Sequence, residues 1–183
     1  MEESVQGSDF SNEAVSEQAL PALQQLVLEP VSVRYRQVNM SVAALVTLLV
    51  LLLIQVAIRQ PFFPLPDPLI VYAGWASIVV FCLGALWLTY HYLADPLVRF
   101  SVRQQDISLS SGLVFRSLVC QPILRVQHVQ IKRGPIARLT GLATLQVYSA
   151  GGSSHTFEIP GLPYEKAAQL RQFILDHRDI SAR

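Results

Sequence analysis

Two uncharged stretches decide the fold: residues 38–58 read VNMSVAALVTLLVLLLIQVAI, and residues 69–89 read LIVYAGWASIVVFCLGALWLT. Each contains 21 residues and no Asp, Glu, Lys or Arg. As an α-helix, each would extend roughly 31 Å, which matches a hydrocarbon core of about 30 Å. Buried helices of a soluble protein are the alternative, but those carry a polar stripe that neither stretch shows. The sequence therefore predicts two membrane spans.

The segment between the spans, residues 59–68, is rich in proline. Pro61, Pro64, Pro66 and Pro68 exclude a helix there and indicate a tight connection. The two spans should therefore form a hairpin. Aromatic residues near both of its ends are typical of membrane interfaces.

Basic residues predict how the hairpin is oriented. Four arginines flank its open end, and the connecting loop holds only Arg59. The four are Arg34, Arg36, Arg99 and Arg103. The positive-inside rule then places the open end and both termini in the cytoplasm. We expect a multi-pass protein of the plasma membrane.

The first 33 residues form an acidic leader without lysine or arginine. A cleavable signal peptide begins with a basic region, so we expect the first span to stay attached. Residues 1 to about 18 are predicted to be disordered and to precede a short interfacial or docking segment, because Pro21 interrupts a weak helical pattern.

After Pro96 the sequence has the alternation of half-buried strands, beginning with Val98, Phe100 and Val102. Further short strands are predicted at residues 107–109, 113–120, 142–149 and 155–159. Residues 123–132 shift parity, which indicates a bulge or sharp bend in one strand, or two strands meeting at a corner.

Two helical segments complete the domain. Residues 136–141 can hold one helical turn. After Pro163, apolar residues recur at helical spacing through His177. Their apolar stripe should cover the open mouth of a curved sheet.

One part of the domain resembles a known family. Residues 123–152, ILRVQHVQIKRGPIARLTGLATLQVYSAGG, are followed by Ile159-Pro160-Gly161-Leu162 and a helix. This arrangement, with two spans before it, resembles the bacterial pleckstrin-homology (PH) domain of YdbS-like membrane proteins over roughly residues 30–180. The resemblance implies an α+β fold, a bent seven-stranded barrel or sandwich closed by the C-terminal helix, at the inner face of a bacterial membrane. It also suggests a larger membrane partner with repeats of the same domain. The expected division is a leader (1–33), a hairpin (34–96) and a PH-like domain (97–183).

No motif for catalysis or metal binding stands out. The four histidines lack metal-ligand spacing, and no glycine-rich phosphate loop is present. Cys82 lies in a span and Cys120 at a strand end, so a disulfide between them is implausible. We expect a protein that is not an enzyme, with no cofactor and no metal.

Charge is the remaining functional signal. The net charge of +1 argues against a nucleic-acid binder, but the segment from Arg99 to Arg138 holds seven basic residues and one acid, Asp106. The candidate basic face consists of Arg99, Arg103, Arg116, Arg125, Lys132, Arg133 and Arg138. Such a face can attract anionic headgroups or an acidic segment of a partner. Ordinary solvated strand faces are the alternative.

Two functions remain open. The favoured one is a non-catalytic, membrane-anchored scaffold that brings proteins together, by association with a related membrane protein or with itself. The alternative is a module that binds or senses anionic lipid. Co-purification separates them, because a scaffold retains a protein partner and a lipid module retains lipid.

Overall fold

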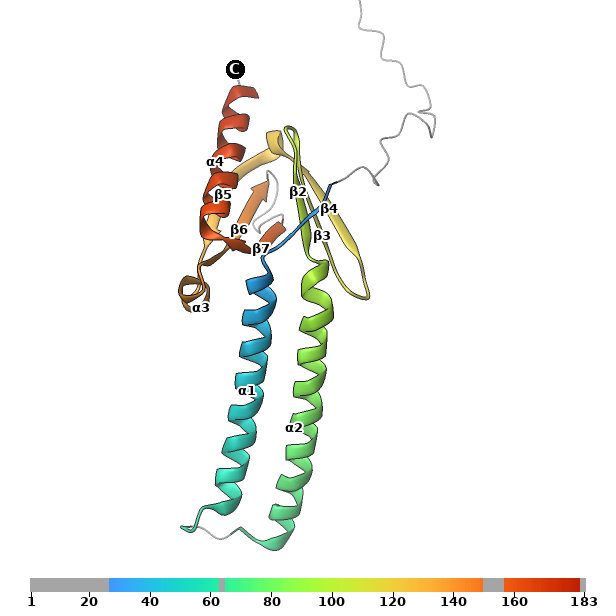
Figure 1. The fold of residues 1–183 in the computed structure, drawn as a ribbon, viewed down its shortest axis with the longest axis vertical. Coiled ribbons are helices and arrows are strands. Elements are labelled where there is room, and N and C mark those ends of the chain that lie inside the picture. The colour runs from blue at the N-terminus through green and yellow to red at the C-terminus, as the bar shows by residue number, and fades with distance from the viewer. Residues whose placement is uncertain (1–26, 63–64, 150–156, 182–183) are drawn as a thin grey trace, which may run out of the picture.

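The computed structural model describes residues 27–62, 65–149 and 157–181. Two long helices, α1 (Val33–Arg59) and α2 (Asp67–Ala94), stand side by side beneath a domain of sheets and one long helix (Figure 1). Both are long and apolar enough to cross a membrane, and only 6% of each apolar segment is buried. So much exposed apolar surface needs an apolar solvent, which supports the predicted membrane hairpin.

Small residues bring the two helices together. Gly84 of α2 is buried against the side chain of Thr47, and Ala43 of α1 is fully buried. The Thr47 hydroxyl donates a hydrogen bond of 2.7 Å to the Ala43 carbonyl, so this polar group is satisfied within its own helix. Helix α2 begins before Pro68, because proline is tolerated in a first turn, where its missing N–H has no helical partner.

The domain contains two antiparallel sheets. The first has the order β1 (Glu29–Pro30), β2 (Arg99–Val102), β3 (Asp106–Ser111) and β4 (Ser117–Pro122). The second has the order β5 (Val126–Lys132), β6 (Leu142–Ser149) and β7 (Phe157–Pro163). The helical segments are η3 (Asp95–Leu97), η4 (Ile123–Arg125), α3 (Pro135–Leu139) and α4 (Tyr164–Ser181). Two sheets with a C-terminal helix confirm the predicted PH-like fold.

The residues that precede α1 are already part of the PH-like domain. Glu29 and Pro30 pair with Phe100 and Arg99 of β2, and Val31 is buried in the core. All three residues were assigned to the leader, but Glu29 and Pro30 form the first strand and Val31 belongs to the core, so the hairpin is inserted between β1 and β2. The predicted disorder of residues 1 to about 18 falls outside the described residues.

The parity shift in residues 123–132 has a clear structural basis. Residues 123–125 form the short helix η4, and the pairing of β5 with β6 is irregular between Val126 and His128. Val126 and Val129 are both buried, which an uninterrupted strand would not allow. The structure thus combines a bend with a bulge.

Residues 113–116 were predicted as strand, but in the structure they belong to the turn before β4.

Helix α4 closes the domain, as expected. Ala167 and Ile174 are fully buried in one core with Leu145 and Ile159 of the second sheet, and Leu170 packs on its margin. Lys166 forms an ion pair with Glu29, which joins α4 to β1. The core therefore includes residues from both sides of the hairpin.

Candidate functional site

Two apolar tips project from the domain toward the membrane. One is the turn between β3 and β4, where Val114 and Phe115 are 80% and 90% exposed. The other is α3, where Ile136 and Leu139 are 49% and 88% exposed. Large apolar side chains exposed at such tips are available to contact another apolar phase or surface.

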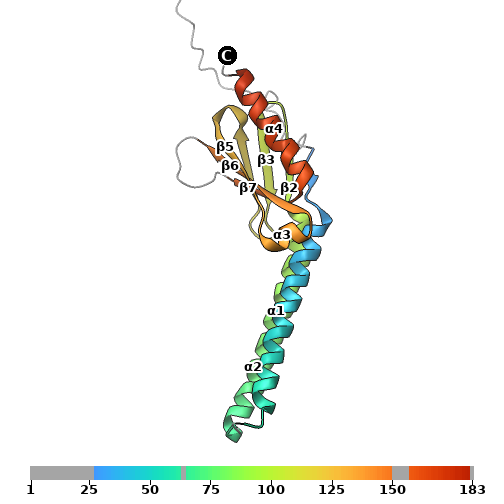
Figure 2. The same ribbon diagram turned by 90° about the vertical axis from the view of Figure 1, so that its left-hand side faces the viewer.

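The positions of the apolar tips fit contact with a bilayer. In Figure 1, α3 and the turn between β3 and β4 lie on opposite sides of the hairpin, level with the domain-facing turns of α1 and α2. Figure 2 shows the same level for α3 from the side. The tips therefore lie level with the domain-facing ends of the two candidate spans.

The structure divides the predicted basic face between the two ends of the domain. Five of its residues lie at the end of the domain that faces the hairpin, which we call the membrane-facing end. They lie beside an apolar tip or beside η3. These are Arg99 at the start of β2, Arg116 in the turn before β4, and Lys132, Arg133 and Arg138 in or beside α3. Arg103 follows β2 at its far end, and Arg125 lies in η4, both away from the membrane. The seven residues thus do not form one continuous face.

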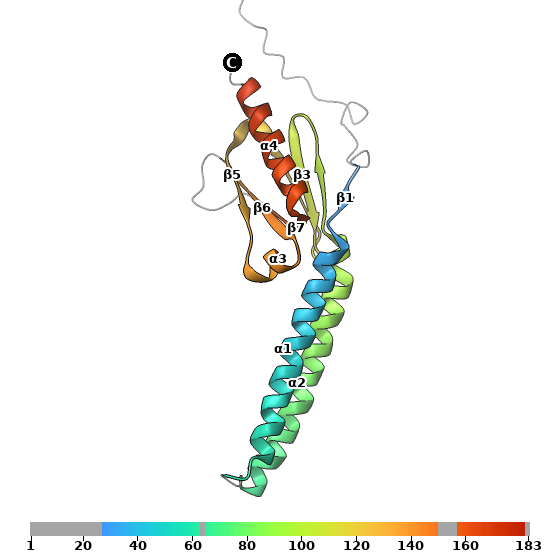
Figure 3. The same ribbon diagram turned by 60° about the vertical axis from the view of Figure 1, so that its left-hand side comes forward.

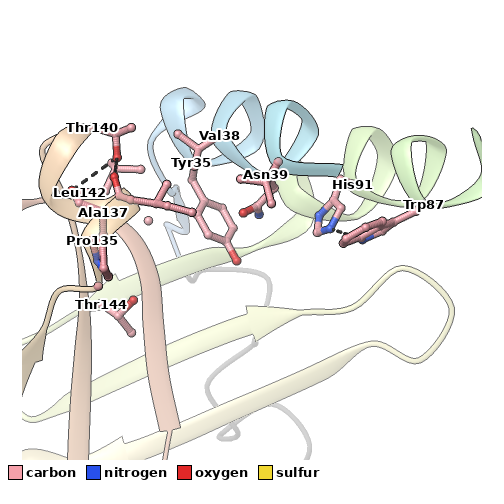
Figure 4. Close-up of a pocket in the computed structure, with 14 residues that line it drawn as sticks. Tyr35, Val38, Asn39, Trp87, His91, Pro135, Ala137, Thr140, Leu142 and Thr144 are labelled. Carbon is pink, nitrogen blue, oxygen red and sulfur yellow. Dashed lines mark hydrogen bonds between the residues drawn. The ribbon is translucent and has the colours of Figure 1, made fainter. Parts of the chain in front are cut away.

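A groove runs between the hairpin and α3, which we call the junction groove. It comprises two cavities of about 390 and 460 Å³ that share Val38, Val42, Ile136 and Thr140. Figure 4 shows the first cavity, with α3 on one side and Tyr35, Asn39, His91 and Trp87 in a row along the helices. Arg34 and Gln37 line the second cavity. Most of the lining is apolar.

A chain of hydrogen bonds fixes the polar side of the groove. The Trp87 indole donates to Nε2 of His91 at 2.9 Å, and Nδ1 of His91 lies 3.1 Å from the Asp95 carboxylate. Because an indole N–H can only donate, Nε2 must accept, and the ring proton is therefore assigned to Nδ1. Asn39 donates to the same carboxylate at 2.9 Å. The buried Asp95 thus joins α1 to the end of α2.

Several contacts hold α3 in place as the wall of the groove. The Arg133 Nε donates to the Leu142 carbonyl at 3.2 Å, and its guanidinium lies 4.4 Å from the centre of the Tyr164 ring. The Tyr164 amide donates to the Gly141 carbonyl at 3.1 Å. Arg133 therefore has a structural role in addition to any contact with headgroups.

Sequence reasoning missed both the network and the tips. Trp87, His91 and Asp95 recur at intervals of four, the spacing at which side chains meet on one helical face, and this signal could have revealed the network. The tips carried a weaker signal. Three consecutive apolar residues, 113–115, interrupt the alternation expected of a strand with one wet face.

Within residues 27–62, 65–149 and 157–181, no group of three His, Cys, Asp or Glu side chains could hold a metal. Nε2 of His91 accepts the Trp87 N–H, so in this arrangement that nitrogen already has a hydrogen-bond partner. Cys82 and Cys120 are free and lie on α2 and β4.

Comparison with known proteins agrees with this architecture. The family described as Bacterial PH domain matches residues 25–178, a range that includes β1 and the hairpin. The chain is also similar to the UPF0699 transmembrane protein YdbS of Bacillus subtilis (strain 168), with 31% identity over 111 residues, covering 56% of this chain and 68% of that protein. No solved structure matches the chain significantly. The protein therefore belongs to the bacterial PH domain family, as a YdbS-like membrane protein whose PH-like domain is interrupted by its membrane hairpin.

Proposed function

We propose that this protein is a non-catalytic module of the bacterial inner membrane, with both termini in the cytoplasm, that binds the anionic surface of the inner leaflet. The apolar tips enter the boundary between headgroups and acyl chains on either side of the hairpin. The basic residues at the membrane-facing end of the domain contact lipid phosphates. The domain is thereby held against the membrane at a fixed depth.

The exposed apolar tips carry this proposal. Moving a side chain such as Phe115 or Leu139 from water into an apolar phase is favourable by about 1.5–3 kcal/mol. A basic residue near an anionic surface adds about 1 kcal/mol. Arg116 and Arg138 lie beside the two tips, so each tip combines both contributions, as interfacial membrane segments do.

The depth of the tips can be measured in the full chain. Cys82→Ala and Cys120→Ser remove the native thiols, and Phe115→Cys or Leu139→Cys then receives an environment-sensitive fluorophore. In nanodiscs that contain anionic lipid, we expect a blue-shifted emission that lipid-borne quenchers reduce and water-soluble quenchers leave nearly unchanged. Gln104→Cys, in the exposed turn at the far end of β2, is the matched control and should show the reverse.

The two positions must differ for the proposal to hold. Equal access of the water-soluble quencher to residues 104 and 115 would refute insertion of the first tip. A depth at position 115 that is the same in anionic and zwitterionic nanodiscs would refute the role of the basic residues.

The scaffold is the second candidate function, and one observation favours it. Within the described residues, β4 pairs only with β3, so its outer edge is open, and its residues 117–122 carry no charge. Such an edge can accept a strand from another chain. Purification from native membranes tests this role. A stoichiometric membrane protein with related PH domains should be retained and should be lost in Leu118→Lys, whereas a partner unaffected by this change would argue against the β4 edge.

A further inference from the structure

The junction groove has the size of a ligand site and an unusual position. Its two cavities, of about 390 and 460 Å³, fall within the range of about 300–1,000 Å³ that is typical of small-molecule sites. Both are bounded by the domain-facing turns of α1 and by α3, the segment that forms the second apolar tip (Figure 3). The groove therefore lies where the bilayer surface meets the domain.

The polarity of the groove changes along α1. Arg34 and Gln37 line the end of the second cavity nearest the domain, and Val38, Ser41 and Val42 line the part that extends along α1 away from the domain. From Arg34 to Val42 the helix rises about 12 Å. A headgroup layer is roughly 5–7 Å thick on each side of the hydrocarbon. The groove is thus long enough to cross the headgroup layer and continue for a similar distance into the hydrocarbon.

This gradient matches the order of groups in a phospholipid. A phosphate carries negative charge and accepts hydrogen bonds, which the guanidinium of Arg34 and the amide of Gln37 can donate. The first part of an acyl chain is apolar, as are Val38, Val42 and Ile136. A small polar metabolite would leave these valines uncovered, and an apolar peptide would leave Arg34 without an anion.

We propose that the junction groove binds one phospholipid of the inner leaflet, with its phosphate at Arg34 and the start of one acyl chain against Val38, Val42 and Ile136. This site deepens the proposed function, because it holds an individual lipid where the apolar tips contact the membrane surface as a whole. The hydrogen bonds that fix α3 keep the groove formed before the lipid enters.

Native mass spectrometry of the full chain, released from nanodiscs, tests the site. We expect one phospholipid retained per chain. Val42→Trp fills the groove and should abolish this adduct. Val46→Trp is the matched control, because Val46 lies one turn farther along the same helix, is 41% exposed and does not line either cavity. Its adduct should persist.

The headgroup contact has a separate readout. In nanodiscs with equal anionic and zwitterionic phospholipid, Arg34→Gln should lower the amount of retained phospholipid of both kinds about fivefold, because both carry the phosphate that Arg34 contacts; this factor corresponds to ~1 kcal/mol per basic residue near the surface, and an unchanged amount would refute the contact. This variant leaves the apolar lining intact, so its result does not depend on how well Val42→Trp folds.

A further variant distinguishes failure of the groove site from failure of the proposed membrane contact by the tips. Phe115→Ser should reduce contact of the first tip with the bilayer and leave the adduct unchanged, because the turn between β3 and β4, which contains Phe115, lies on the other side of the hairpin from α3 (Figure 1). Absence of a retained phospholipid in the unmodified chain would overturn the groove as a lipid site. Equal retention by Val42→Trp and Val46→Trp would do the same.

Discussion

Replacing Gly161 by alanine should weaken the junction between hairpin and domain. Gly161 lies in β7, is buried and has a φ of +67°, in the left-handed region that favours glycine. A Cβ at this position would lie 2.5 Å from both Cβ and Cγ of Tyr35 on α1. Because the helix backbone fixes the Tyr35 Cβ, a rotamer change cannot remove this overlap. Either α1 or β7 must shift.

The expected loss in the free energy of unfolding follows from the left-handed backbone and from the overlap with Tyr35. The left-handed conformation costs an alanine about 1–2 kcal/mol. Forcing an extra methyl group into a packed contact costs about 1–3 kcal/mol. The free energy of unfolding should therefore fall by about 2–5 kcal/mol. A shift would also strain the 3.1 Å hydrogen bond from the Ser32 amide to the Gly161 carbonyl.

Gly141 provides a matched control. Its φ is +71°, close to that of Gly161, but a Cβ there would meet nothing within 4 Å. Gly141→Ala should therefore lose only about 1–2 kcal/mol. Urea unfolding of the full chain in detergent micelles, followed by circular dichroism, would compare the two variants. Equal losses would refute the argument that contact with Tyr35 requires glycine at position 161.

Three further predictions follow from the packing of the hairpin and its orientation. Gly84→Ala should destabilise the helix pair by about 1–3 kcal/mol, because its methyl group would overlap the Thr47 side chain, and Thr47→Ala in the same chain should recover most of this loss in detergent-induced unfolding. No recovery would contradict this packing. Asp95→Ala should lower unfolding stability by about 1–3 kcal/mol, because Asn39 and His91 lose their acceptor, whereas Trp87→Phe, which removes one donor, should have a smaller effect. Alkaline phosphatase fused after Arg183 should be inactive and green fluorescent protein at the same point should fluoresce, since the basic flanks predict that this end lies in the cytoplasm. Active phosphatase would reverse the orientation.

The fold was largely predictable where its signals were local. Hydropathy defined the hairpin, and the change of parity between Val126 and Val129 predicted the irregular register of β5. Strand β1 was not predictable in this way. It contains only Glu29 and Pro30, and its partner β2 begins at Arg99, beyond both spans. Two residues are too few to show the alternation of a strand. No local sequence pattern indicates that residues before the hairpin pair with residues after it.

The site was less predictable because its residues meet only through topology. Antiparallel strands carry successive turns to alternate ends of a sheet, so basic residues that are close in sequence can separate in space. Arg103 and Arg116 lie in successive turns and therefore at opposite ends of β3. Counting charges identified the basic half of the domain, but only the sheet order shows which residues face the membrane.

The insertion of the hairpin between β1 and β2 would allow weak lipid contacts to suffice for the proposed function. A domain joined to a membrane by one linker can rotate, and each contact with the bilayer must then overcome the entropy of ordering it. Here the chain crosses the junction twice, into α1 directly after β1 and out of α2 through η3 into β2. The bonds from Ser32 to Gly161 and from Asn39 to Asp95 hold the two crossings to the domain and to each other. Because the orientation is fixed before any lipid binds, the free energy of each tip would contribute almost fully to the proposed membrane contact.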